Sequence, residues 1–251
     1  MLTSERKALI QRILRQDGRL VAKDFSQKLG VSEDTIRRDL RELAADGLLQ
    51  RVHGGALPAS SAVADFASRE QVGSSTKARL GQAAARMIQP GQIVFLDGGT
   101  SNVQLARHLP HDLQAVVVTH SPSIAVELVR HPSVEVELIG GRLFKHSIVA
   151  VGATSAEAIS RIRADLFFMG ATGVHPETGI TTGDREEAAI KALIARQSAE
   201  TIVLATEEKL GAASPYQIVP LTDIGTLVTV AGLSEETLRP FRSAGLTLVE
   251  A

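Results

Sequence analysis

The chain has 251 residues, with 27 Lys and Arg against 28 Asp and Glu and a hydrophobic share of 44%. This composition is typical of a soluble globular protein that is long enough for one large domain or two modest ones. Because it contains no cysteine, disulfides, thiol nucleophiles and cysteine–metal sites are excluded. The absence of Trp, with a single Tyr, argues against aromatic platforms for single-stranded nucleic acid.

The first residues, MLTSERKALI, do not form a signal peptide, and no apolar run reaches the length of about 18 residues that a membrane helix needs. A cytoplasmic location without a membrane partner is therefore expected. Charge is divided unevenly along the chain. Residues 1–57 hold 11 Lys and Arg against 8 Asp and Glu, whereas the remainder holds 16 against 20.

Residues 1–57 predict a small domain of three helices. The first helix is expected over Glu5–Gln16, and the second over Ala22–Leu29, where Gly30 supplies a left-handed closing residue. Ser32 can cap the third helix, whose Ile36, Leu40 and Leu43 share one face. Arg38 and Arg41 then point away from that face, with Thr35 and Arg37 on its flanks.

A short helix that is buried on one side and cationic on the other suits the major groove of DNA. The alternative is a solvated helix on which Asp34, Arg38 and Glu42 form an i,i+4 ladder of ion pairs. The surrounding pattern favours DNA binding, because the run 48–55 alternates as a short hairpin, or wing, would. The candidate DNA-binding residues are Ser32, Thr35, Arg37, Arg38, Arg41, Arg51 and His53.

Residues 58–75 are rich in Ala, Ser and Gly and are interpreted as a linker that is partly helical around Phe66–Gln71. The alternative is a loop inside one domain, although such a loop would be long. From Thr76 to residue 251 helices alternate with short apolar strands, which indicates a mainly parallel sheet covered on both faces. The expected strands are Ile93–Leu96, Ala115–Thr119, Val134–Ile139, Leu166–Met169, Ile202–Ala205, Thr226–Val230 and Thr247–Val249. The expected helices are Thr76–Gln89, which Thr76 would cap, Asn102–Leu109, Ser123–Arg130, Ser155–Ile162, Arg185–Gln197 and Glu235–Arg239.

Several of these strands end in Gly- and hydroxyl-rich turns, and ligands of open α/β sheets lie beyond the carboxyl ends of the strands. The segment Asp97–Ser101 can hold a phosphate with its backbone and hydroxyl groups, or can be an ordinary capped turn. The segment is neither a Walker loop nor G-x-G-x-x-G, so no nucleotide cofactor is expected. The other candidate effector residues at strand ends or just beyond are His120, Gly141, Arg142, Gly170, Thr172, Glu187, Lys191 and Lys209.

Each of these side chains also has an ordinary structural interpretation. His120 can be a satisfied buried residue, and Arg142 can be solvated instead of clamping a phosphate. The segment 179–183 is expected to lead into a helix, on which Glu187 and Lys191, at i,i+4, can form a simple surface pair. Lys209 follows a strand and is the cation most expected near a phosphate after Arg142.

The run VSEDTIRRDLRELAADGLLQRVHGGA closely resembles the N-terminal signature of DeoR-type bacterial transcriptional regulators, and weaker motifs continue in the family's order. The resemblance implies a winged helix-turn-helix followed by a Rossmann-like three-layer α/β/α domain similar to ribose-5-phosphate isomerase and coenzyme A transferases. It also implies a repressor of carbohydrate genes whose effector is a phosphorylated sugar. The Asp97–Ser101 loop would lie on the phosphate side. The predicted partners are double-stranded DNA, this sugar phosphate and a second copy of the chain, in a homodimer or larger oligomer, with no cofactor and no metal.

Three positions depart from the family's pattern. His120 stands where Asn is frequent, Thr206 precedes Glu207-Glu208-Lys209 where Asp is frequent, and Val230 follows Thr229 where Asp is frequent. These departures suggest an altered effector preference or a weakened pocket.

Because the resemblance includes an isomerase fold, an enzyme fused to a DNA-binding head is the alternative function. Aldose–ketose isomerisation needs a carboxylate base beside the carbonyl carbon. Asp97, Glu187 and Lys191 could supply such a site, but the Met169–Gly173 turn lacks the isomerases' Asp-rich motif. We therefore predict that the chain is not an enzyme and has no catalytic residues.

Overall fold

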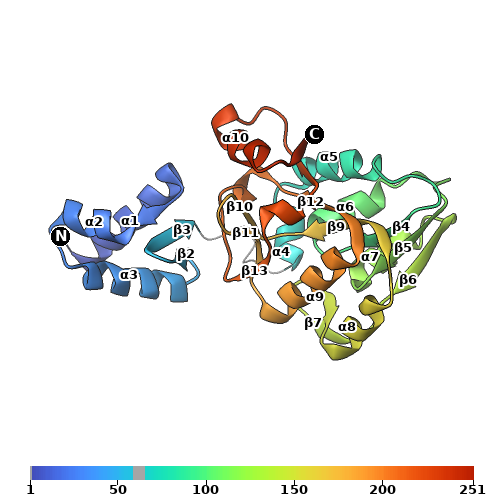
Figure 1. The fold of residues 1–251 in the computed structure, drawn as a ribbon, viewed down its shortest axis with the longest axis horizontal. Helices are drawn as coiled ribbons and strands as arrows, with labels where there is room; N and C mark the ends of the chain where they lie inside the picture. Colours follow the sequence, from blue (N-terminus) through green and yellow to red (C-terminus); the bar gives the residue numbers. More distant parts are fainter. Residues whose placement is uncertain (1, 59–65) are drawn as a thin grey trace.

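The computed structural model describes residues 2–58 and 66–251 of the chain. The N-terminal unit, called the head, consists of α1 (Thr3–Asp17), β1 (Leu20–Val21), α2 (Ala22–Leu29), α3 (Glu33–Ala45), β2 (Leu49–Val52) and β3 (Gly55–Pro58). Its strands pair in the order β1-β3-β2, which confirms the winged helix-turn-helix. The head lies at one end of the molecule, with the wing strands towards the larger domain (Figure 1).

The head is held by one small apolar core. Ile10, Phe25, Ile36 and Leu40 are each at most 4% exposed and come from all three helices. Gly55 is required in the wing because an added Cβ would lie 1.8 Å from the backbone oxygen of Leu20. The Gly-Gly step thus lets β3 pair closely with β1.

The linker prediction is partly tested. Residues 59–65 lie outside the described residues, whereas α4 (Phe66–Gln71) forms where a helical part was expected. The next helix, α5 (Ser74–Ala85), begins two residues before the predicted Thr76, with Gly73 at the N-cap position. The expected Thr76 cap is therefore wrong. The boundaries 1–57, 58–75 and 76–251 stay predictions.

The larger domain contains a seven-stranded sheet of order β15-β14-β12-β9-β4-β5-β6, in which every pairing is parallel. Its strands are β4 (Ile93–Leu96), β5 (Ala115–Thr119), β6 (Val134–Leu138), β9 (Ala164–Gly170), β12 (Ser198–Leu204), β14 (Thr226–Thr229) and β15 (Thr247–Glu250). All seven strands predicted from the sequence form, with end points within a few residues.

Helices cover both faces of this sheet, as the predicted three-layer α/β/α fold requires. Alternate residues of each strand enter different cores: Phe167 packs with residues of α8 (Ala153–Ser160), α9 (Arg185–Arg196) and α10 (Glu235–Ser243). Its neighbour Phe168 packs with residues of α5, α6 (Thr100–Arg107) and α7 (Pro122–Leu128).

The larger domain also contains two small antiparallel sheets that the sequence pattern does not predict. One pairs β7 (Arg142–Phe144) with β8 (Val149–Val151), and the other has the order β10-β11-β13. Its members are β10 (Gly173–His175), β11 (Gly179–Thr182) and β13 (Tyr216–Val219). The segment 179–183, which was expected only to lead into a helix, therefore contains strand β11. In Figure 1 this second sheet lies on the side of the larger domain that faces the head.

Candidate functional site

The third helix of the head presents the two faces that the sequence predicts. Ile36, Leu40 and Leu43 are buried, whereas Arg38 and Arg41 are exposed. The alternative ladder does not form: across the described part of the chain, Arg38 has no ion pair, and Glu42 pairs with Lys7 at 2.8 Å. Two positive side chains therefore remain available to a partner.

The start of this helix is fixed by the predicted cap. Ser32 Oγ accepts a hydrogen bond from the Thr35 backbone N–H at 3.2 Å, and the two hydroxyls lie 2.9 Å apart. Arg37 Nη2 lies 2.7 Å from Glu33 Oε1 one turn earlier, which raises the pKa of Arg37 through a hydrogen bond and charge attraction. Ser32 therefore serves as the N-cap of α3, whereas Thr35 and the arginines lie within the helix.

A hollow of about 230 Å³ between α3 and the wing brings three of the predicted DNA-binding residues together. It is lined by Ala22, Arg37, Leu40, Arg51, Val52, His53, Gly54 and Gly55. Arg51 and His53 are exposed on the wing. Helix and wing therefore form one basic surface with a concave centre.

A buried ion pair that the sequence pattern does not predict joins α1 to α3. Arg6 and Asp39 are 6% and 0% exposed, and the guanidinium contacts both carboxylate oxygens, with Nη2 at 3.0 Å from Oδ1. The hydrogen bond to Asp39 raises the pKa of Arg6 despite the opposing effect of burial. The pair fixes the third helix against the first.

In the larger domain, a buried cluster joins the carboxyl ends of β4 and β9 to α9. The Lys191 ammonium lies 3.0 Å from Asp97 Oδ2, 3.0 Å from Glu187 Oε1 and 2.7 Å from the Gly170 carbonyl oxygen. Thr182 donates to Glu187 Oε2 at 2.6 Å. Because an ammonium has three donors, Lys191 is fully occupied by the protein. Glu187 and Lys191 thus form a buried pair and not the alternative surface pair.

Asp97 is the centre of this cluster and is 0% exposed. Its oxygens accept from the Gly98 and Gly170 N–H groups at 2.7 Å each, and His120 Nε2 lies 2.8 Å from Oδ1. Burial raises the pKa of Asp97, but Lys191 and His120 outweigh burial and hold it below the ordinary value. Gly170 must be glycine because a Cβ there would lie 2.6 Å from the Gly98 carbonyl oxygen.

The departure at His120 has a structural explanation. The ring is 0% exposed and spans Asp97 Oδ1 and the Ala150 carbonyl oxygen, which lies 2.8 Å from Nδ1. His120 therefore connects the loop after β4 to strand β8 and positions Asp97 from behind. The structural interpretation of this residue agrees with its geometry.

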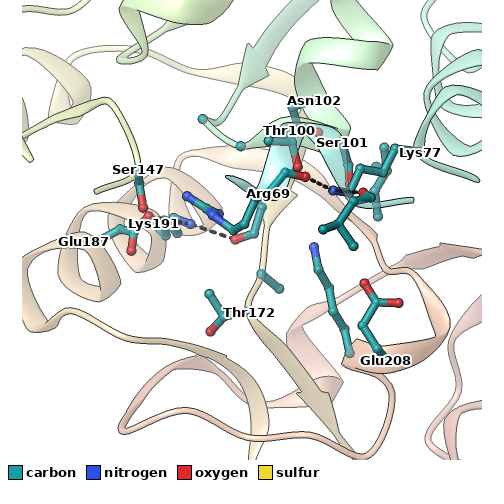
Figure 2. A pocket seen from close by; sticks show the side chains of 17 residues that line it. Arg69, Lys77, Thr100, Ser101, Asn102, Ser147, Thr172, Glu187, Lys191 and Glu208 are labelled. Atoms are coloured by element: carbon teal, nitrogen blue, oxygen red, sulfur yellow. Dashed lines mark hydrogen bonds and ion pairs between the residues drawn. The ribbon is translucent and has the colours of Figure 1, made fainter. Parts of the chain in front are cut away.

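In front of the cluster lies a cavity of about 140 Å³, called the strand-end cavity. Its lining comprises Arg69, Val72, Lys77, Gly98, Gly99, Thr100, Ser101, Asn102, Ser147, Gly170, Ala171, Thr172, Glu187, Lys191, Leu204, Glu208 and Lys209. Figure 2 shows Glu187 and Lys191 along one side of it, with Lys77 and Glu208 on the opposite side. The turns that follow β4, β9 and β12 thus meet at this cavity.

The first turn of α6 forms part of this lining. Gly99 occupies the N-cap position with φ 119°, and the free N–H groups of a first helical turn are donors for an anion. Ser101 is 6% exposed, and its Oγ has no hydrogen-bond partner within residues 2–58 and 66–251. A buried hydroxyl without a partner beside a cavity is the feature expected of a ligand contact.

Two lysines supply positive charge to the strand-end cavity. Lys209 has no ion pair among the described residues, and burial lowers its pKa to about 8, with Glu208 opposing and Lys77 adding to the shift. Lys77, which was not among the predicted site residues, is 5% exposed and donates to the Val72 carbonyl oxygen at 2.7 Å and to that of Arg69. Burial likewise lowers the pKa of Lys77.

Four of the predicted effector residues do not line the strand-end cavity. Asp97 and His120 lie behind it in the buried cluster, while Gly141 and Arg142 lie at the start of β7. Arg142 is exposed and pairs with Glu186, which agrees with its solvated interpretation. The other nine, from Gly98 to Lys209, are in the lining.

The described part of the chain contains no group of three or more His, Cys, Asp or Glu that could hold a metal ion. Within that part, no helix combines the length and apolar character needed to cross a membrane.

Comparison with known families divides the chain into two matched parts. A model of the DeoR-like helix-turn-helix domain matches residues 6–62, and a model of the DeoR C-terminal sensor domain matches residues 73–230.

Curated relatives match the chain over almost its whole length. The transcriptional regulator GlpR of Haloferax volcanii is 36% identical over 100% of this chain and 98% of its own. The regulator GolR of Listeria innocua is 30% identical over 98% of both. The repressor GlcR of Bacillus subtilis is 32% identical over 91% of this chain and 89% of its own.

Among solved structures, the sorbitol operon regulator SorC from Klebsiella pneumoniae matches with a TM-score of 0.44 and 14% identity, over 95% of this chain and 98% of its own. Ribose 5-phosphate isomerase from Methanocaldococcus jannaschii matches with a TM-score of 0.40 and 15% identity, over 53% and 52%.

Proposed function

The chain belongs to the DeoR family of helix-turn-helix transcriptional regulators, and we propose that it represses carbohydrate genes under control of a phosphorylated sugar. The observation that carries the DNA-binding part is the basic surface of the head. There Arg38 and Arg41 are exposed opposite the buried face of α3, and the wing adds Arg51 and His53. A helix in the major groove with a flanking wing uses such a surface.

The small charge surplus of the head supports dimer formation. Residues 1–57 carry 11 basic against 8 acidic side chains, so one head neutralises few phosphates. Two heads on neighbouring half-sites would provide the missing contacts, as in other helix-turn-helix dimers. We therefore propose a homodimer or larger homo-oligomer in the cytoplasm.

The strand-end cavity is the proposed effector site. Its cationic groups, the first turn of α6 and the unpartnered Ser101 hydroxyl together suit a phosphate monoester. Lys191 binds both Asp97, which lies behind the cavity, and Glu187, which lines it. The role of these three side chains is therefore to position the loops that hold the ligand. The relatives are named as regulators, which agrees with the prediction that the chain is not an enzyme. The mutual pairing of these three side chains agrees with it as well.

Changing Arg38 to alanine tests the DNA-reading surface. A direct base contact is worth about 1–3 kcal/mol, so we expect operator affinity to fall by about 5- to 150-fold, with a relaxed preference at one base position. The measurement is a titration by fluorescence anisotropy against the operator and against single-base variants. Arg12→Ala removes the same charge from an exposed position on α1 and should change affinity little. Equal behaviour of both variants would show that α3 is not the reader.

The pKa of Lys209, about 8, predicts how effector affinity depends on pH. Below this pKa the ammonium is charged and attracts the phosphate. Above it the charge is lost, so affinity should fall by about tenfold between pH 7 and pH 9. The phosphate itself is already a dianion over this range, since its second pKa is near 6. Calorimetric titration with sugar phosphates at pH 7, 8 and 9 measures the effect.

The control for this pH profile is Lys209→Arg, whose charge does not titrate in this range. It should flatten the profile. A wild-type profile that is flat from pH 7 to pH 9 would contradict the assignment of Lys209 to the phosphate.

A further inference from the structure

A second cavity, called the head-side cavity, lies where the head meets the larger domain and has a volume of about 300 Å³. Its head side is formed by Ala44, Gly47, Leu49 and Gln50. Its other side is formed by Phe144, His146, Thr172, Thr182, Gly183, Asp184, Glu187, Ala213, Ser214 and Pro215. Small-molecule sites occur preferentially at such meeting points between domains.

The two cavities adjoin. Thr172 and Glu187 belong to the lining of both, so these two side chains separate the strand-end cavity from the head-side cavity. Thr172 Oγ1 lies 2.7 Å from Ser214 Oγ and donates to the Thr181 carbonyl oxygen at 3.0 Å. The dividing wall is thus made of hydroxyl and carboxylate groups.

The chemistry of the two cavities differs. The strand-end cavity contains lysine ammonium groups, whereas the described lining of the head-side cavity contains no Lys or Arg. It offers instead the carboxylate of Asp184, the hydroxyl of Ser214, and the ring of Phe144, which stacks on that of His146 with centroids 5.8 Å apart. Such a wall repels a phosphate but accepts the hydroxyl groups and the apolar face of a sugar.

We propose that the two cavities form one bipartite site, in which the phosphate occupies the strand-end cavity and the sugar carbons extend past Thr172 into the head-side cavity. This inference rests on the proposed function, because it assumes a sugar phosphate effector. It narrows the effector to phosphates of pentoses or hexoses, since a three-carbon phosphate would be held by the strand-end cavity alone. It also gives the effector a direct contact with the head, at Leu49 and Gln50.

This contact provides a physical route from ligand to DNA. Gln50 is next to Arg51 on β2, and Ala44 lies in the last turn of the helix that carries Arg38 and Arg41. A ligand can shift the position of the head only if it binds the two placements with different affinity. A sugar that fills the space between head and larger domain can meet that condition, because residues of both units line this space and its shape therefore depends on the placement of the head.

A substitution at position 183 can test the bipartite site. A Cβ added at Gly183 has no heavy atom within 4 Å, its backbone is not left-handed, and the residue lines the head-side cavity. Gly183→Leu therefore adds bulk to that cavity without backbone strain. Gly140 has the same open surroundings and ordinary backbone but lines neither cavity, so Gly140→Leu is the matched control.

The probes are glycerol 3-phosphate and a panel of pentose and hexose phosphates, titrated calorimetrically into the full chain, with melting temperature as the control for folding. We expect Gly183→Leu to bind the tightest pentose or hexose phosphate at least tenfold more weakly than wild type while glycerol 3-phosphate affinity is unchanged. Gly140→Leu should match wild type with both probes.

Two results would overturn the bipartite site while leaving the proposed function intact. One is an unchanged affinity of Gly183→Leu for the longer phosphates, and the other is an equal loss for glycerol 3-phosphate in a variant that melts as wild type does. If no sugar phosphate binds the wild-type chain, the effector part of the proposed function itself is wrong.

Discussion

Replacing Asp39 with alanine should lower the free energy of unfolding of the head by about 3–5 kcal/mol, because it leaves the buried Arg6 guanidinium without its partner. A unit of this size has little stability to spare. Operator binding should therefore be lost at moderate temperature, even though Asp39 points into the head and not towards DNA. Chemical denaturation followed by circular dichroism should show an early transition of the head, with the larger domain unchanged.

Two comparisons separate this effect from a general loss of charge. Glu33→Ala removes a carboxylate from the exposed pair with Arg37, so it should leave the stability of the head almost unchanged. The double variant Arg6→Met/Asp39→Leu replaces the buried pair by apolar side chains and should recover most of the lost stability. A loss below about 1 kcal/mol in Asp39→Ala would mean that the pair does not hold α1 to α3.

The head could be predicted almost completely from its sequence because its signals are local. The spacing of Ile36, Leu40 and Leu43, the Ser32 cap and the Gly30 closure each depend on residues within one or two turns. The Arg6–Asp39 pair could not be predicted, because it joins positions 33 residues apart. Nothing in the neighbouring sequence distinguishes Asp39 from an exposed helical carboxylate. Its only signal is that Asp39 falls between buried Ile36 and Leu43 on the helix.

In the larger domain, the central strands were predictable because they are continuous apolar runs. The small strands β7, β10, β11 and β13 were not predictable, because they are short and some are polar. In addition, β13 lies far along the chain from its partner β11. Thr181, for example, pairs with Gln217 across 36 positions of sequence.

The site shows the same division between local and distant signals. The turn Asp97–Ser101 and the strand end at Gly170 were predicted from the rule that ligands gather at carboxyl edges. Whether a charged residue lines the cavity or lies behind it depends on the side chains that pack around it, which a single sequence does not reveal. Asp97 lies behind, and Lys77 was missed because it comes from a helix that precedes the sheet.

The buried cluster of Asp97, Glu187 and Lys191 predicts how the stability of the larger domain depends on pH. In wild type the pKa values of Asp97 and Glu187 lie below their ordinary values, because the charge of Lys191 outweighs the opposing effect of burial. Carboxylates whose pKa is depressed on folding stabilise the protein above their unfolded values, near 3.8 and 4.5, and this stability is lost as pH falls through the folded values. The pKa of Lys191 is raised by both carboxylates against burial, so its contribution is complete below 10.5.

Lys191→Met should reverse this dependence on pH. The variant leaves two buried carboxylates facing each other, which should cost about 3–5 kcal/mol at pH 7 and raise their pKa values above the unfolded ones. The native state then binds more protons at these two carboxylates than the unfolded state does, so the stability of the variant should rise relative to that of wild type as pH falls from 7 to 5. The substitution leaves His120, which contacts Asp97, unchanged, so it removes only the charge of Lys191 from the cluster.

Urea unfolding of the larger domain at pH 5, 6 and 7 measures this difference. Lys145→Met, which removes an exposed lysine near β7, should follow wild type at every pH. Because Lys191 uses all three of its donors within the protein, the effector affinity of the folded variant should fall only through displacement of the loops that Asp97 and Gly170 hold. A variant whose stability changes between pH 7 and pH 5 in parallel with that of wild type would show that the cluster is not held by the Lys191 charge.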